Sequence, residues 1–280
     1  MYKRVLLLTD LEGVNNVVGE PYQGLSKDSA QWHVARKQMA LELNAAAEAL
    51  FAAGVERIGV WDGHGGGNNI DPADLDPRLN LFSMPANRTF QDVVDAHSGY
   101  DCVAFFGYHT MEGTLGGVLA HTMNSKVIQY YKINGKYVGE VDLDAAIAAD
   151  FDLPACFFAG GDLSCKQAAR TVPGIVTVVT KTELSRNNAI FRNNEELFAE
   201  IKEKIVAAMH IDQRPYKLSY PLTMEKSFKR TEDAAVYLQS LQGAGVFCDY
   251  LDDEILGKDA HTVVSQADNV ETFIKCIRGK

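Results

Sequence analysis

The stretch LLLTDLEGV at residues 6–14 ends an apolar run with two carboxylates, Asp10 and Glu12, only two positions apart. If the run is a buried strand, both side chains emerge at its carboxyl end and point roughly the same way, because side chains alternate with a period of two. Two negative charges held this close repel each other unless a positive charge lies between them. We therefore expect a cation at this strand end.

Two further apolar runs end in residues of the same chemical kind. RIGVWDG contains Asp62 and leads directly to His64, and DCVAFFGYH ends in His109, three residues before Glu112. In an open α/β sheet the loops at the carboxyl ends of neighbouring strands converge on the binding crevice. The three strand ends are therefore expected to form one site.

A fourth polar residue follows a predicted hairpin. The segment VIQYYKINGKYVGEV at residues 127–141 contains Asn134 and Gly135, which can supply the positive φ values of a type I′ turn between two arms. The second arm ends at Glu140. We expect this carboxylate to join the same site.

The residue types at these strand ends indicate the chemistry. Carboxylates and neutral imidazoles are ligands suited to zinc, manganese or cobalt. Three carboxylates and two histidines exceed what one tetrahedral zinc uses, so two ions that share a bridging carboxylate fit better. Each residue alone is more often a turn former or a helix cap, but agreement between several strand ends favours a metal site.

The elements that position these residues follow βαβ order, which predicts a mostly parallel sheet covered by helices on both faces, a three-layer α/β/α fold. Residues 1–210 are predicted to form this α/β domain, and residues 211–280 a smaller C-terminal α+β extension or subdomain. The expected strands are 4–10, 57–63, 101–109, 156–161 and 174–180, and the clearest helices are 38–54 and 193–210.

Composition excludes several classes of function. The formal net charge of −10, without a Lys/Arg cluster, argues against a nucleic-acid binder. The five cysteines are scattered without CxxC spacing, which favours reduced thiols in a cytoplasmic protein. The apolar run after Met1 is too short for a signal peptide or a membrane span, and no longer run follows.

Four motifs together resemble a known family. DLEG, DGHGGGNN, GYHTMEGTLGGVLAHT and NGKYVGEVDLDAA, followed by GGD, are similar in order and spacing to those of the zinc-dependent D-aminopeptidases, the M55 metallopeptidases. The resemblance covers about residues 6–190 and is weak over the last 70. It implies hydrolysis of short peptides that begin with a D-residue, and assembly into a ring-shaped homo-oligomer.

The resemblance also implies residue roles. It makes His121 the catalytic histidine, acting either as nucleophile or as proton shuttle. It implies a centre of two divalent ions, expected to be Zn²⁺, with Asp10 as the bridging ligand; the five ligands are Asp10, Glu12, His64, His109 and Glu140.

Neighbouring residues are given supporting roles from their positions alone. Asp62 and Glu112 are candidates to orient His64 and His109. Lys181 and Arg186 are candidates to approach a substrate carboxylate.

Two other functions stay open from the sequence. One is a dipeptide-binding protein that uses the metal only to hold its ligand. The other is a two-metal phosphoesterase or a different amidohydrolase, because a fold does not choose among these reactions.

Overall fold

A computed structural model describes residues 1–82 and 89–279. Its larger part is a six-stranded sheet in the order β3-β2-β1-β4-β7-β8, and every strand pair in it is parallel. The strands are β1 (Arg4–Thr9), β2 (Arg57–Asp62), β3 (Asn80–Phe82), β4 (Cys102–Tyr108), β7 (Ala155–Gly160) and β8 (Val176–Val179).

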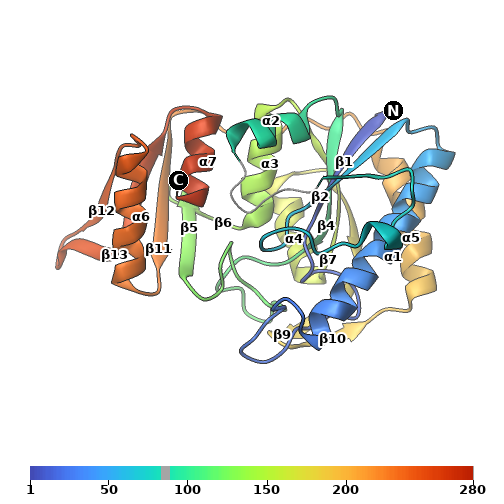
Figure 1. Ribbon diagram of the computed structural model, residues 1–280, viewed down its shortest axis with the longest axis horizontal. Helices are drawn as coiled ribbons and strands as arrows, with labels where there is room; N and C mark the ends of the chain where they lie inside the picture. The colour runs from blue at the N-terminus through green and yellow to red at the C-terminus, as the bar shows by residue number, and fades with distance from the viewer. Residues whose placement is uncertain (83–88, 280) are drawn as a thin grey trace.

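Helices cover both faces of this sheet (Figure 1). The long helices α1 (Ala30–Ala52) and α5 (Asn194–Ala208) pack on one face, and α2 (Phe90–His97), α3 (Glu140–Asp150) and α4 (Asp162–Thr171) pack on the other. Strand β1 shows why: Val5 and Leu7 belong to one hydrophobic cluster, and Leu6 and Leu8 to the other. A strand buried on both faces reads as a continuous apolar run. The predicted three-layer α/β/α fold is confirmed.

Helix α1 begins earlier than its predicted start at residue 38. The side chain of Ser29 caps its amino end by accepting a hydrogen bond from the backbone N–H of Trp32. At the other end Gly54 adopts a φ of 88°, a conformation that favours glycine, immediately after the helix ends. The predicted end of this helix is therefore confirmed within two residues.

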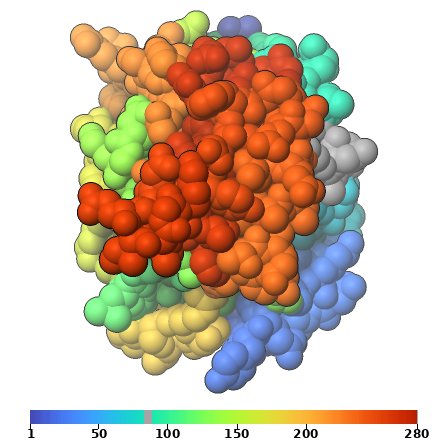
Figure 2. Space-filling model, turned by 90° about the vertical axis from the view of Figure 1, so that its left-hand side faces the viewer, coloured from blue at the N-terminus to red at the C-terminus, as the bar shows by residue number. Residues whose placement is uncertain are grey.

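A second sheet is antiparallel, with the order β12-β13-β11-β5-β6. Its strands are β5 (Ile128–Ile133), β6 (Lys136–Val138), β11 (Leu222–Phe228), β12 (Cys248–Asp253) and β13 (Gly257–Ala267). Helices α6 (Thr231–Gly243) and α7 (Val270–Arg278) pack on it. Figure 2 shows this end of the molecule, covered largely by the C-terminal segment.

The β5–β6 hairpin turns at Asn134 and Gly135, whose φ values of 50° and 77° are both positive, as predicted. This hairpin belongs to the second sheet, so that sheet combines segments from before and after residue 211. The division of the chain into two parts at residue 211 stays a prediction. Glu140 lies at the start of α3 and not at the end of a strand, since β6 ends at Val138.

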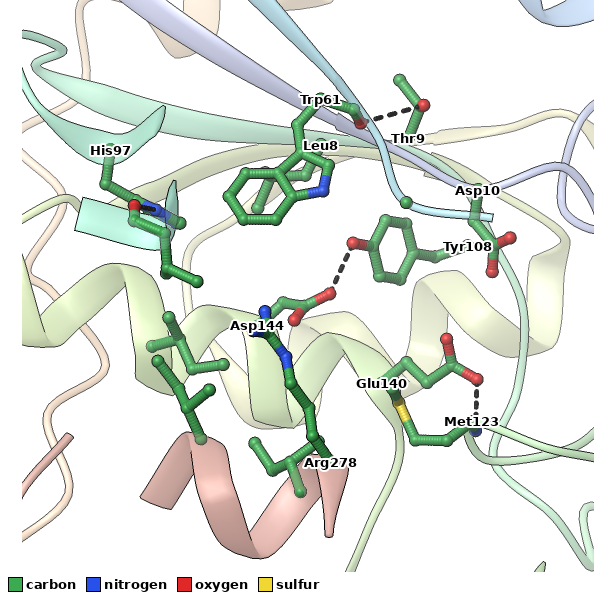
Figure 3. A pocket seen from close by; sticks show the side chains of 15 residues that line it. Leu8, Thr9, Asp10, Trp61, His97, Tyr108, Met123, Glu140, Asp144 and Arg278 are labelled. Carbon is green, nitrogen blue, oxygen red and sulfur yellow. Dashed lines mark hydrogen bonds between the residues drawn. The ribbon is translucent and has the colours of Figure 1, made fainter. Parts of the chain in front are cut away.

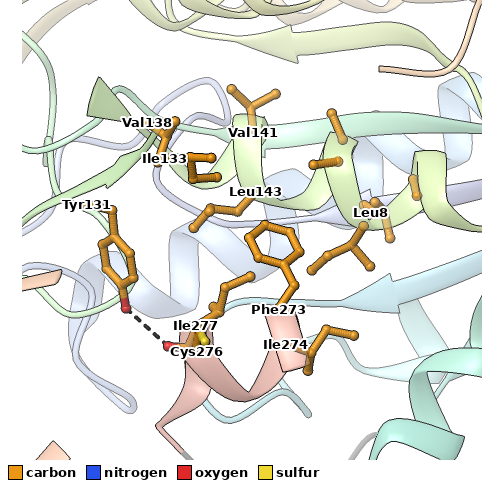
Figure 4. Packing of buried hydrophobic residues seen from close by; sticks show 14 of the residues in the cluster. Leu8, Tyr131, Ile133, Val138, Val141, Leu143, Phe273, Ile274, Cys276 and Ile277 are labelled. Carbon is orange, nitrogen blue, oxygen red and sulfur yellow. Dashed lines mark hydrogen bonds between the residues drawn. The ribbon is translucent and has the colours of Figure 1, made fainter. Parts of the chain in front are cut away.

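Helix α7 joins the two parts of the fold. Phe273, Ile274 and Ile277 pack in the same hydrophobic cluster as Leu143 of α3 (Figure 4). The hydroxyl of Tyr131 donates a hydrogen bond to the carbonyl oxygen of Ile277. The last helix of the chain is therefore held against the parallel-sheet domain.

Two shorter elements complete the described chain. A 3₁₀ helix spans Pro72–Asp74, and β9 (Lys181–Ser185) pairs with β10 (Asn188–Phe191) in a separate hairpin. Within the described part of the chain, no helix combines the length and the apolar character needed to cross a bilayer.

Candidate metal centre

Three adjacent strands of the parallel sheet bring the predicted residues together. Because β1 lies between β2 and β4, the segments after these strands meet at one edge. Asp10 and Glu12 follow β1, His64 follows β2, and His109 follows β4. Glu140 reaches the same place from the first turn of α3. The structure therefore brings together the residues that the strand-end argument named.

One group of ligand-type atoms surrounds His64. Its Nδ1 lies 2.9 Å from Oδ1 of Asp10 and 3.1 Å from Oε2 of Glu12. Both carboxylates are buried, at 5% and 4% exposure. These three side chains lie close enough to hold one metal ion.

A second group surrounds Glu140. Nε2 of His109 lies 3.2 Å from Oε1 of Glu140 and also 3.2 Å from Oδ2 of Asp10. Nε2 of His121 lies 3.8 Å from the same oxygen of Glu140. Asp10 thus presents one oxygen to each group, the arrangement expected of a carboxylate that bridges two cations.

The surroundings of His109 are the clearest indication of a cation site. Its Nδ1 donates to the carbonyl oxygen of Thr110 at 2.9 Å, so the hydrogen is on Nδ1 and Nε2 has a free lone pair. That Nε2 is buried and forms no hydrogen bond with the described residues, although two carboxylate oxygens lie 3.2 Å away. A lone pair and two carboxylates aimed at one point fit a divalent ion.

His121 stacks on His109, with ring centroids 4.0 Å apart and an angle of 9° between the planes. Its Nδ1 donates to the carbonyl oxygen of Leu119 at 2.8 Å, which leaves Nε2 free to face the site. The structure therefore places the histidine that the family resemblance singled out beside Glu140, within the second group.

The charges in this centre compensate one another. Burial raises the pKa of Asp10, but His109 and His64 outweigh that effect and hold the pKa well below its usual value. Burial lowers the pKa of His64, but the charges of Glu12 and Asp10 outweigh it and raise the pKa well above the usual value. The buried carboxylates therefore make the centre strongly attractive to positive charge.

Glycines allow the turn after β1 to approach β4. A Cβ on Gly13 would lie 2.1 Å from the carbonyl oxygen of Tyr108, and one on Gly107 would lie 2.1 Å from that of Asp10. Gly107 also adopts a φ of 71° where the pairing of β4 with β7 shifts register. Only glycine fits at both positions, so this contact fixes Asp10 and Glu12 relative to His109.

Asp62 supports His64 through the loop backbone. Its carboxylate accepts hydrogen bonds from the backbone N–H groups of Asn69 and Ile70 and from Nδ2 of Asn69. Nδ2 of Asn69 also donates to the carbonyl oxygen of His64. Asp62 was predicted to orient the imidazole of His64. Its observed link to His64 runs through Asn69 to the backbone carbonyl of His64.

Glu112 does not provide the contact that orients His109. That contact comes from the carbonyl oxygen of Thr110. Oε2 of Glu112 is buried and has no hydrogen-bond partner among the described residues, and its backbone N–H donates to Oγ1 of Thr122. A backbone carbonyl leaves no sequence signal, so this contact could not be predicted.

Lys181 has a role that the sequence did not indicate. It is fully buried, and its Nζ donates to the carbonyl oxygens of Glu12, Val14 and Val17 over 2.5–2.9 Å. It therefore fixes the backbone that carries Glu12 and does not approach a substrate carboxylate. Arg186, by contrast, lines the cleft above the centre.

The centre opens into a cleft with a cavity volume of about 250 Å³. Asp10, Glu12, His64, His121 and Glu140 line its floor. Its rim is formed by segments 23–26 and 123–126 and by Arg186, which contributes a positive charge opposite the carboxylates. A small molecule with a free amine and an anionic end matches this distribution of charge.

Comparisons with known proteins agree with these observations. A D-aminopeptidase of Bacillus subtilis is 28% identical over 184 residues, which cover 66% of this chain and 65% of that relative, so the match spans less than two thirds of its length. The solved structure of the Zn-dependent D-aminopeptidase DppA from Bacillus subtilis, described as a self-compartmentalizing protease, has the same fold, with a TM-score of 0.83 and 23% identity. This likeness covers 98% of this chain and 96% of that one. The model of the M55 peptidase family, described as D-aminopeptidase, matches residues 3–245, and the chain belongs to this family.

Proposed function

We propose that this protein is a two-metal aminopeptidase that hydrolyses short peptides with an N-terminal D-residue. The observation that carries the proposal is the position of Asp10, whose two oxygens face two separate groups of ligand-type side chains. Membership of the D-aminopeptidase family supports the reaction class. The relatives named above support zinc and the preference for a D-residue.

Five side chains would hold the ions. Glu12 and His64 would bind one, His109 and Glu140 the other, and Asp10 would bridge them. Two bound divalent ions would polarise the scissile carbonyl and bring the pKa of a water molecule close to neutrality. The backbone N–H of Met123 donates to Oε1 of Glu140 at 2.6 Å and so helps to hold that carboxylate in place.

His121 would move the proton. Its Nδ1–H is engaged by the carbonyl oxygen of Leu119, so the free Nε2 is the atom that can accept a proton from the attacking group and return it to the leaving amine. Stacking on His109 limits rotation of the ring. His121 therefore reaches the substrate from the side of Glu140 with a fixed orientation.

The cleft favours small substrates. Its volume of about 250 Å³ suits a dipeptide or tripeptide, and Arg186 and Lys126 at its rim would attract the substrate carboxylate. We further propose that subunits assemble into an oligomer that encloses the sites, since the structural relative is described as self-compartmentalizing.

The test is hydrolysis of D-Ala-D-Ala and L-Ala-L-Ala by the purified protein as isolated, after chelation, and after zinc is returned. We expect cleavage of the D-peptide alone, lost with chelator and restored by zinc. Failure to cut either peptide while two ions are bound would contradict the proposed substrate. Cleavage that survives complete removal of metal would contradict the proposed mechanism.

A further inference from the structure

A second cavity lies directly beside the metal centre, and Asp10, Met123 and Glu140 are part of its wall (Figure 3). Its volume of about 80 Å³ has room for roughly five water-sized groups. Most of its wall is apolar, and the apolar side chains are Leu8, Trp61, Val93, Met123, Ile147, Ile274 and Ile277.

The cavity and the cleft share part of their walls. Asp10, Gly63, Met123 and Glu140 line both. Two of these four are proposed metal ligands, so a group held at the centre lies next to the entrance of the cavity. An apolar pocket that adjoins a few fixed polar groups is the usual form of a site for a small ligand.

We propose that this cavity receives the side chain of the N-terminal residue of the substrate, and that it selects unbranched or branched aliphatic side chains of up to about four or five heavy atoms. The inference rests on the proposed function, which places the free amine and the scissile carbonyl at the two ions. The α-carbon between those groups then lies beside Asp10 and Glu140. Its side chain enters the apolar cavity that adjoins both residues.

The C-terminal helix gives the pocket its shape. Ile274, Ile277 and Arg278 of α7 form the wall that faces Trp61 and α3. Figure 3 shows the side chain of Arg278 reaching from α7 toward Asp144. A segment far from the metal-binding motifs would therefore decide which peptides are cut.

One part of the cavity wall, beside Asp10 and Glu140, is polar (Figure 3). The hydroxyl of Tyr108 donates to Oδ2 of Asp144 at 2.6 Å, and both residues line the cavity. An apolar side chain packed against this pair would remove water from the Asp144 carboxylate without replacing its hydrogen bonds, which is unfavourable. The side chain is therefore expected to lie against the apolar part of the wall. The limit on the size of the side chain comes from the cavity volume of about 80 Å³.

The same geometry accounts for selection by configuration. Once the amine and the carbonyl are fixed, the two configurations at the α-carbon send the side chain in different directions. The proposal requires that the side chain of a D-residue enter the cavity and that the side chain of an L-residue be directed elsewhere. A cavity on one side of the ions therefore discriminates D from L peptides in proportion to the size of the side chain.

The experiment compares D-Ala-D-Ala, D-Val-D-Ala and D-Leu-D-Ala as substrates of the zinc-loaded protein and of Ile274→Phe, which narrows the cavity. In Ile274→Phe we expect the ratio of kcat/KM for D-Leu-D-Ala to kcat/KM for D-Ala-D-Ala to be at least 10-fold lower than in the parent protein. Ile277→Ala, which widens the cavity, should raise the same ratio. Ile255→Phe is the matched control, because Ile255 is 92% exposed on the turn between β12 and β13, and it should leave the ratio unchanged.

A binding measurement separates this inference from the proposed function. Calorimetric titration of the same proteins, zinc-loaded, with D-alanine hydroxamate and D-leucine hydroxamate requires no turnover. The ratio of affinity for D-leucine hydroxamate to affinity for D-alanine hydroxamate should fall in Ile274→Phe and rise in Ile277→Ala. That result supports the side-chain pocket even if no peptide is cut. The side-chain pocket would be overturned if both ratios, of kcat/KM and of affinity, were the same in Ile274→Phe, Ile277→Ala and the parent protein.

Discussion

His109 and His121 lie face to face, with 4.0 Å between ring centroids, and Nε2 of each points toward Oε1 of Glu140. They differ in their other contacts: Nε2 of His109 also lies 3.2 Å from Asp10. This difference supports the proposed roles, which are metal binding for His109 and proton transfer for His121. Replacement of His109 should therefore cause loss of bound metal. Replacement of His121 should reduce activity and leave the metal content unchanged.

His121→Ala is expected to retain two zinc ions per subunit and to lose about 10²–10⁴-fold in kcat, the usual contribution of a general acid or base. Zinc content by mass spectrometry and kcat on D-Ala-D-Ala are measured on the same sample. The matched control is His210→Ala, an exposed histidine after α5, which should change neither quantity. Loss of one zinc ion in His121→Ala would instead make this residue a ligand.

The bridging role of Asp10 predicts a difference in metal content between two variants. Asp10→Ala should lower the occupancy of both metal positions, because each has one of its oxygens as a ligand. Glu12→Gln should lower that of one position only. Zinc per subunit after dialysis against a weak chelator provides the measurement, with Glu254→Ala on the exposed β12–β13 turn as control. Equal losses in both site variants would show that Asp10 does not bridge.

Lys181→Met is expected to lower the free energy of unfolding by about 3–5 kcal/mol, because three buried carbonyl oxygens lose their donor. Burial lowers the pKa of Lys181 to about 8, although the negative charges of Glu183, Glu42 and Glu12 oppose this shift. Urea unfolding of the zinc-free proteins isolates this effect from metal binding.

Lys202→Met is the control for this variant. Lys202 forms an exposed ion pair with Glu48 at 2.7 Å, and its loss should cost less than about 1 kcal/mol. If the two lysine variants unfold at the same urea concentration, Lys181 does not support the turn that carries Glu12.

His97 makes the stability of the fold depend on pH. Burial lowers its pKa to about 4, against about 6.5 in the unfolded chain, so the unfolded state binds the proton more readily. Stability from this group is therefore complete above pH 6.5 and falls as the pH decreases toward 4, by about 3 kcal/mol in total. His97→Phe retains a ring that can stack on Phe151, and does not titrate.

The difference in free energy of unfolding between the parent protein and His97→Phe isolates the effect of this one residue. As the pH falls from 7 to 4, the parent protein should lose about 3 kcal/mol more of its free energy of unfolding than His97→Phe does. Parallel pH profiles for the two proteins would mean that His97 is not buried as a neutral ring.

The parallel-sheet domain and the strand-end residues could be predicted because both depend on local patterns. Apolar runs such as β1 are continuous when both faces of a strand are buried, and polar residues at their carboxyl ends meet at one edge of the sheet. Asp10, Glu12, His64 and His109 were predicted in this way, and Glu140 through the Asn134-Gly135 turn.

The contacts that complete the site could not be predicted, because they join residues that are far apart in the sequence. The carbonyl oxygens that orient His109 and His121 leave no trace in residue type. Lys181 lies more than 160 positions from the three carbonyls to which it donates. Likewise, nothing local to α7 indicates that Ile274 and Ile277 line a cavity beside the centre.

The most direct test of the central claim is a titration of the metal-free protein with zinc, followed by the rate of D-Ala-D-Ala hydrolysis at each step. Two ions bridged by Asp10 predict that activity rises until two equivalents per subunit are bound and then stays constant. Full activity at one equivalent, or in the absence of any divalent metal, would contradict the account.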